Sequence, residues 1–245
     1  YYNYKQLINK KMKTFTKVSP VMPASIQKVA YADTEILFDW HKVEGFKGGS
    51  IDGVKVIVRG TNGAAQTMVG IDLLFATSHI ASPSSDGSVD VAPTTLGTTG
   101  AAVDTPGWFN NLVGYVPIVA GDFNDADLIY LNIANKDLSG MEVPVNGDLY
   151  VAAVSKGALD FASTVQVNTE TATNTTAVVV KTTSALINFA PGDVLHDEAD
   201  QVIGTVKSVT DATNLVLTKN CASVSAVNQD LYNVSPIQLI LSGTV

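Results

Sequence analysis

From Ala32 onward, apolar and polar residues alternate in short runs that end at Gly, Pro, Asn, Asp or Ser. A period of two is typical of strands with one buried face, and helical periodicity is almost missing. The runs recur about every 8 to 20 residues, which suits a sandwich or barrel. We predict an all-β chain, a β-sandwich or jelly-roll-like domain, with strands at 35–40, 53–59, 66–76, 113–118, 127–133, 148–154, 165–167, 177–182, 194–195, 202–209, 214–217 and 237–242.

The composition indicates a folded protein whose surface is poor in charge. Of the 245 residues 46% are hydrophobic, enough for a sizeable core, and only 16% are charged. Cys221 is the single cysteine, so no intrachain disulfide can form. No stretch approaches the about 18 apolar residues that a membrane span needs. We expect folding in a reducing cytoplasm and no membrane partner.

The order of the runs predicts a domain with an insertion. Residues 32–163 form the predicted sandwich, and residues 164–235 form a small Thr- and Val-rich β module whose hairpin 193–206 turns through an acidic cluster. The apolar run at 236–241 has no local partner, so we expect it to return to the sandwich and complete it with residues 236–245. Asn62-Gly63 is predicted to be a hairpin turn between the strands on either side of it.

Residues 1–31 are predicted to be a basic N-terminal arm. The first 32 residues contain six lysines and no acidic residue, whereas residues 61–245 contain five basic and eighteen acidic side chains. Such an arm should bind an anionic neighbour. Because the body is acidic, we do not expect nucleic acid as a partner. The residues we expect to anchor the arm to a protein surface are Lys5, Lys10, Lys11, Lys13 and Lys17.

A long polar segment, 81–105, interrupts the sandwich and is rich in Ser, Thr, Gly and Ala. A loop of this length inside a compact domain is usually functional or contacts a neighbour. Trp108 and Phe109 follow it directly. They either cap the core or insert into an adjoining subunit, and the second alternative makes them candidate intersubunit contacts.

Catalytic patterns are missing from the sequence, so we expect no enzyme activity and no cofactor. His41, His79 and His196 lie at strand ends or turns, outside any nucleophile elbow or His-Glu-x-x-His motif. Cys221 has no flanking cation and is interpreted as an inert buried thiol.

Two acidic clusters, at 122–127 and 197–200, bring several oxygen ligands together. Counted from Asp122, the calcium-loop pattern requires Gly at its sixth position and Glu at its twelfth, but the chain has Asp127 and Ile133 there. We interpret both clusters as solvated turns and expect no metal. A metal that bridges two subunits is the alternative.

Two passages resemble structural proteins of tailed bacteriophages. Residues 70–76, 108–118 and 149–157 resemble a layout in which an apolar strand precedes a variable loop and the sheet closes with a Leu-Tyr-Val-Ala-Ala-Val strand. Residues 192–194 and 202–213 resemble a small β module in virion proteins of marine and cyanobacterial phages. The resemblance covers about residues 50 to 218.

The resemblance implies a non-enzymatic protein that decorates or cements a capsid. The expected partners are the major capsid protein and further copies of the chain, as a homo-oligomer such as a trimer or as neighbours on the shell. The expected location is the capsid surface of a virion assembled in a bacterial host. A tail or neck component, or a glycan- or receptor-binding sandwich, are the alternatives.

Overall fold

The computed structural model describes residues 13–46, 48–62, 64–80, 90–91, 93, 95–103, 111–126, 130–143, 148–181 and 188–244. These residues confirm the all-β prediction, with strands packed as a sandwich-like fold. The predicted anchors Lys5, Lys10 and Lys11 lie outside the described residues, as do Trp108 and Phe109.

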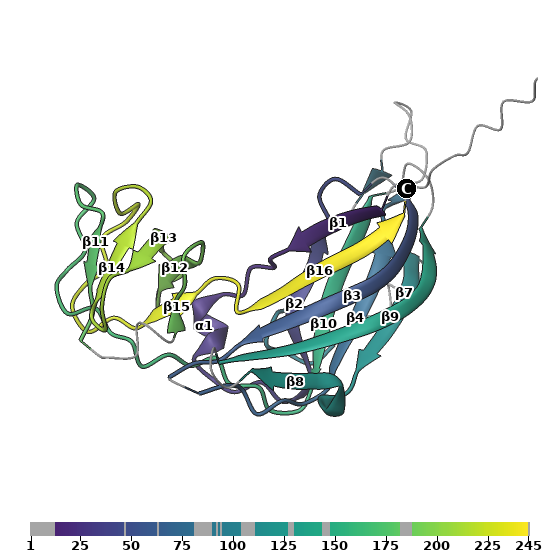
Figure 1. The fold of residues 1–245 in the computed structure, drawn as a ribbon, viewed down its shortest axis with the longest axis horizontal. Coiled ribbons are helices and arrows are strands. Elements are labelled where there is room, and N and C mark those ends of the chain that lie inside the picture. The colour runs from purple at the N-terminus through teal and green to yellow at the C-terminus, as the bar shows by residue number, and fades with distance from the viewer. Residues whose placement is uncertain are drawn as a thin grey trace, which may run out of the picture.

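Two antiparallel sheets form the sandwich (Figure 1). The first, sheet A, has the order β1-β16-β3-β9-β8. Its strands are β1 (Lys13–Val18), β16 (Ile237–Thr244), β3 (Gly49–Arg59), β9 (Leu131–Val143) and β8 (Phe123–Ala126). The second, sheet B, has the order β2-β10-β4-β7. Its strands are β2 (Asp33–Lys42), β10 (Leu149–Lys156), β4 (Ile71–Thr77) and β7 (Leu112–Ile118).

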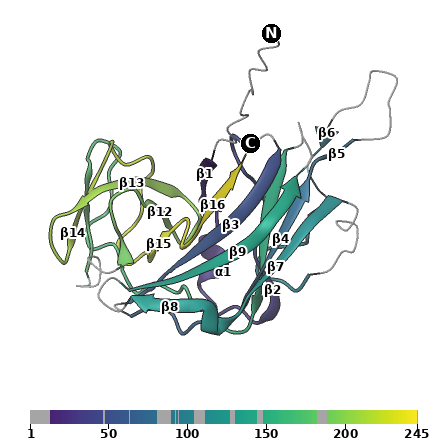
Figure 2. The ribbon, with the colours of Figure 1, turned by 45° about the vertical axis from the view of Figure 1, so that its right-hand side comes forward.

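Strands distant in sequence are neighbours in both sheets. In sheet A the first strand pairs with the last, β1 with β16, and β3 pairs with β9. In sheet B β2 pairs with β10, and β4 pairs with β7. The chain therefore crosses repeatedly between the layers, which Figure 2 shows as β3 and β9 on one side and β4 and β7 on the other.

Strand alternation builds the core between the sheets. In β16, Ile237, Leu239 and Leu241 are buried, whereas the residues between them are partly exposed. The buried residues pack with inward residues of the other strands, among them Val56 of β3, Ile71 of β4 and Val151 of β10. One apolar core thus spans both layers, as expected for a sandwich.

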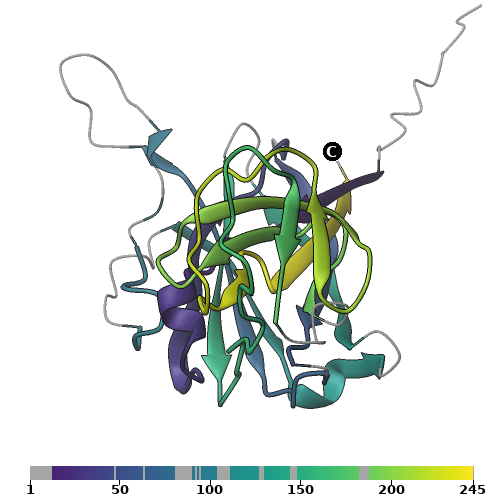
Figure 3. The same ribbon diagram turned by 90° about the vertical axis from the view of Figure 1, so that its left-hand side faces the viewer.

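The residues between β10 and β16 form a separate small sheet. Its order is β11-β14-β13-β12-β15, and it has its own apolar core. The strands are β11 (Ala177–Val179), β12 (Val194–Asp197), β13 (Val202–Val209), β14 (Asn214–Leu217) and β15 (Leu231–Asn233). β12 and β13 pair as the predicted hairpin. We call this unit the module; it lies at one end of the sandwich (Figure 1) and faces the viewer in Figure 3.

The described part of the predicted arm belongs to the folded body. Residues 13–18 are β1, and the short helix α1 (Ala24–Gln27) follows at the boundary with the module. Among the described residues, the other helix with defined bounds is the three-residue 3-10 helix η2 (Ala120–Asp122). None of the described helices is long and apolar enough to cross a membrane.

The predicted hairpin at Asn62-Gly63 is wrong. A turn exists, because Thr61 bridges to Ala64, but the strands on either side enter different sheets. β3 pairs with β16 and β9, and β4 pairs with β10 and β7. The sequence correctly predicted a turn, but burial of β3 and β4 in different sheets outweighed local pairing between them. A further two-strand ribbon, β5 (His79–Ile80) with β6 (Asp90–Val91), lies beyond β4.

Leu239 tests the position of β16 in the core. Leu239→Ala removes a fully buried side chain between the sheets, so we expect a loss of about 2–5 kcal/mol in the free energy of unfolding. Ile240→Ala, one residue along on the outer face, should cost much less. Urea denaturation measures both. Equal losses for the two variants would contradict the observed alternation.

Candidate functional site

The outer face of sheet A carries two lysines in one row of residues that crosses its strands. The register aligns Lys17 of β1 with Ile240 of β16, and Ile240 with Lys55 of β3. Asn135 of β9 continues the row. Because residues directly opposite each other share a face, these side chains lie on the side of the sheet away from the core. Lys17 and Lys55 are both exposed.

Next to this row lies a shallow groove. Phe15 of β1 aligns with Ser242, and Ser242 aligns with Gly53 of β3. Gly53 has no side chain to fill the space, and a Cβ there would meet Lys136 O and Ser242 Oγ at 3.2 Å. Phe15 lines the groove and is 74% exposed, so a large apolar side chain is open to solvent beside the lysines. We call Phe15, Lys17, Gly53, Lys55 and Ile240 the β1 face.

The lysines of the β1 face lack an ion pair with any described residue, unlike other cations of the protein. Lys136 Nζ lies 2.7 Å from Asp122 Oδ2, and Lys42 Nζ lies 2.7 Å from Asp148 Oδ2. No carboxylate of the described chain lies within ion-pair distance of Lys17 or Lys55.

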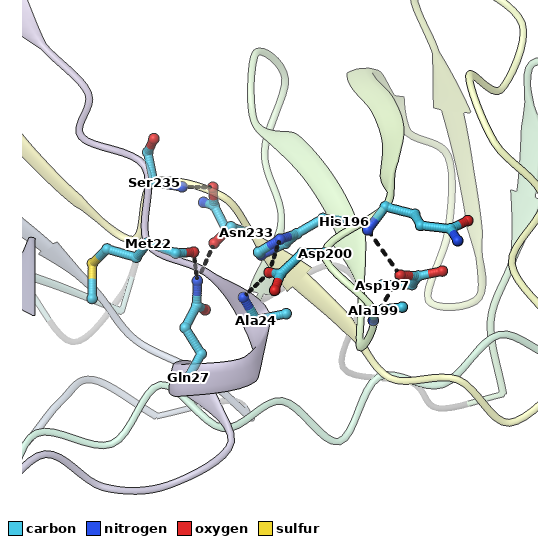
Figure 4. Close-up of polar contacts among 10 residues, drawn as sticks. Met22, Ala24, Gln27, His196, Asp197, Ala199, Asp200, Asn233 and Ser235 are labelled. Atoms are coloured by element: carbon cyan, nitrogen blue, oxygen red, sulfur yellow. Dashed lines mark hydrogen bonds and ion pairs between the residues drawn. The ribbon is translucent and has the colours of Figure 1, made fainter. Parts of the chain in front are cut away.

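The joint between sandwich and module is built from polar contacts around α1 (Figure 4). The side chain of Gln27 is buried and donates from Nε2 to Met22 O at 2.7 Å and to Asn233 O of β15 at 3.0 Å. The backbone N–H of Ala24 donates to Asp200 Oδ1. These contacts bind the helix to the module on two sides.

A buried ion pair lies at the same joint. Arg59 Nη2 at the end of β3 lies 2.6 Å from both carboxylate oxygens of Asp193, just before β12. Their side chains are 18% and 4% exposed. A second, more exposed ion pair joins the same parts of the chain, with Lys28 Nζ 3.1 Å from Glu198 Oε2. The module is thus fixed to the sandwich.

The acidic cluster at 197–200 lies at this joint and is a solvated turn only in part, because Asp197 is buried whereas Asp200 is exposed. Asp197 Oδ1 accepts the backbone N–H of Ala199 and of Gln201, at 2.9 and 3.1 Å. Glu198 accepts from the backbone N–H of Asp230 at 2.9 Å, and hydrogen bonds from this N–H and from Lys28 lower its pKa. The described residues contain no group of three or more side chains suited to a metal.

In the other cluster, Asp122 accepts from Lys136 and from the backbone N–H of Val119, and these two bonds lower its pKa. Asp127 lies outside the described residues.

The remaining chemical candidates lie apart from one another. His196 is buried in the module, its Nδ1 3.4 Å from Asp200 Oδ1, and burial lowers its pKa. His41 is partly buried in β2, where burial also lowers its pKa. Cys221 is buried, and its burial raises the pKa of the thiol. His79 lies in β5.

Sequence reasoning found Lys17 but missed Phe15 and Lys55. Lys55 falls in a predicted strand, yet its face became evident only through pairing with β16. The sequence predicted β1 as part of an arm, because only Phe15 and Val18 of its six residues are apolar and they do not alternate with a period of two.

Comparisons of the chain with protein-family models, with curated proteins and with solved structures gave no match. The β1 face and its charges are therefore the basis for assigning a function.

Arg59→Met tests the joint. It leaves the nearly buried carboxylate of Asp193 without its cation, so we expect a loss of about 3–5 kcal/mol in unfolding free energy. Lys42→Met breaks an ion pair that is more exposed, with side chains 40% and 25% accessible, and should cost much less. Urea denaturation compares them, and a similar loss in both variants would contradict a buried, stabilising joint.

His196 should make stability depend on pH. Burial lowers its pKa below 6.5, although Asp200 and Asp197 act in the opposite direction, so the unfolded chain binds the proton more readily. Stability should therefore fall as pH drops below about 6.5. His196→Gln should show a smaller loss between pH 7.5 and 5.5 in chemical denaturation. The same loss in variant and wild type would contradict this assignment.

Proposed function

We propose that this chain is a non-enzymatic structural protein of a virion, a capsid decoration or cement protein that binds the major capsid protein. The observation that carries the proposal is the β1 face. On a chain with a net charge of −8, Lys17 and Lys55 are exposed and free of described partners beside an exposed Phe15. Exposed apolar area with free cations fits a protein surface that bears carboxylates.

The strand pairing also supports the proposal of a virion structural protein. A jelly roll is a long antiparallel hairpin rolled into two sheets, so its first strand pairs with its last, its second with its second-last, and so inward. The pairs β1–β16, β2–β10, β3–β9 and β4–β7 follow this order when the four-residue edge strand β8 is set aside, with the module inserted before the last strand. Jelly rolls are common in viral capsid and lectin domains. A jelly roll is thus the finer fold that the pairing favours.

The N-terminal lysines belong to the proposed capsid contact because of their charge and their place in the sequence. Lys13 and Lys17 lie on β1, and Lys5, Lys10 and Lys11 precede it in the sequence. In the proposed arrangement all five engage carboxylates of the capsid protein, and many weak contacts are repeated over the shell. Exposed ion pairs are screened by salt, so attachment should weaken as ionic strength rises.

The fixed module gives such a protein a second surface. Because the Arg59–Asp193 pair and the α1 contacts hold the module at one end of the sandwich, it keeps its orientation when the β1 face is bound. In the proposed arrangement the module projects beyond the shell. A tail or neck component would use the same two surfaces, and mass spectrometry of separated heads and tails distinguishes the locations.

A glycan-binding module is the alternative from another class. The observation that favours it is Tyr115, which is 54% exposed on β7 beside Asp72 and the apolar side chain of Leu112. An aromatic ring next to a carboxylate can stack on a sugar and accept its hydroxyl groups. Binding on a glycan array that Tyr115→Ala abolishes would favour this alternative over the capsid role.

Replacing Lys5, Lys10, Lys11, Lys13 and Lys17 with Gln tests the capsid role. If each exposed contact contributes a few tenths of a kcal/mol, the five together should weaken attachment to purified particles about tenfold or more. The salt dependence should also become shallower. Co-sedimentation over a salt titration measures both effects.

The control variant replaces Lys207 and Lys219, two exposed lysines of the module, with Gln. It should bind as the wild type does. Unchanged occupancy of the five-lysine variant at every salt concentration would contradict the proposal.

A further inference from the structure

The sandwich has four outer strands, β1 and β8 in sheet A and β2 and β7 in sheet B. An outer strand leaves backbone N–H and C=O groups unpaired along one side, and a second chain can pair with them. Folded proteins protect such edges with bulges, proline, short strands, charged side chains or a covering segment. The four edges differ in this protection.

Both edges of sheet B are protected. Residues 100–102 run along β2, where Ile36 N donates to Ala101 O at 2.9 Å and Gly100 N donates to Ile36 O at 2.8 Å. β7 contains Pro117, which has no N–H, and its pairing with β4 has a register shift. In sheet A, β8 has only four residues.

The edge of β1 is regular, and no segment of the described residues covers it. Its six residues pair with β16 from Lys13↔Thr244 to Val18↔Leu239 without a register shift. The strand contains no proline, and no described segment pairs with its other side. Phe15 at its centre is 74% exposed. Among the described edges of the sandwich, β1 therefore depends on its lysines alone for protection.

The lysines of β1 determine which kind of chain can pair with its free edge. If two copies paired antiparallel about Phe15, position 13 of one copy would lie opposite Lys17 of the other, so like charges would meet. An acidic strand would instead find a cation opposite its carboxylate. The charge pattern thus disfavours a second copy of this chain and favours an acidic partner.

We infer that the free edge of β1 binds an extended acidic segment of the partner protein, which adds a sixth strand to sheet A. This rests on the proposed function and specifies its contact. Main-chain hydrogen bonds hold the segment, as in other cases of strand addition. Its side chains on the β1 face alternate, with a carboxylate opposite Lys17 and an apolar residue two positions away, opposite Phe15. Lys55, two strands inward, adds positive potential to the same face.

A synthetic peptide tests this on the full chain. The probe is an acetylated and amidated peptide that repeats Thr-Glu-Thr-Val, which places Glu and Val alternately on one face of a strand. The control peptide has the same composition with its Glu residues adjacent. Hydrogen–deuterium exchange is followed at residues 13–18. At millimolar alternating peptide, we expect amides on the free side of β1 to exchange at least about tenfold more slowly, and the control peptide to have much less effect.

Variants separate main-chain pairing from general charge attraction. Lys17→Glu should weaken binding of the alternating peptide about tenfold, whereas Lys207→Glu on the module should leave it unchanged. Absence of protection in β1, equal protection by both peptides, or an unaltered Lys17→Glu variant would overturn the inference.

The same exchange measurement on particles keeps the two proposals apart. A chain that attaches to particles while its β1 amides exchange as in the free protein would overturn the strand addition and leave the capsid role standing. A chain that does not attach at all would overturn the capsid role itself.

Discussion

The insertion of β16 between β1 and β3 is the interaction on which the rest of the structure depends. It closes the sandwich core through Leu239, and it aligns Lys17, Ile240 and Lys55 in one row on the outer face. It also requires the chain to return from the module to the sandwich, so the joint at Arg59 and Asp193 lies directly beside the start of β16. The core, the alignment of the exposed lysines and the position of the module thus depend on one strand.

Local patterns in the sequence predicted the fold class and most strands, because the period of two and the turn residues are local signals. The strands at 202–209 and 214–217 match the structure at both ends. The sequence was a weaker guide to which strands pair with each other. The turn at Asn62 suggested a hairpin, but burial of β3 and β4 in different sheets decided their partners. β1 was missed because its lysines and the prolines that follow resemble a free arm.

The candidate site was only partly predictable for the same reason. A lysine count identified Lys17, but only the register places Phe15 and Lys55 beside it. The acidic hairpin at 197–200 had the residues of a solvated turn or a weak metal site. Its oxygens instead accept from α1, from Lys28 and from the backbone, contacts that require the distant N-terminal segment. Charge composition led to the expectation of an anionic partner, and the strand register identified the face that we propose for it.

In the proposed function, the cationic β1 face of an otherwise acidic chain is the surface that contacts a larger shell. A reconstruction of the purified particle that resolves this chain measures it directly. We expect β1 and the outer side of sheet A to lie against the capsid protein, with carboxylates near Lys17 and Lys55 and the module pointing away. A reconstruction in which sheet A faces solvent while another surface makes the contact would contradict it.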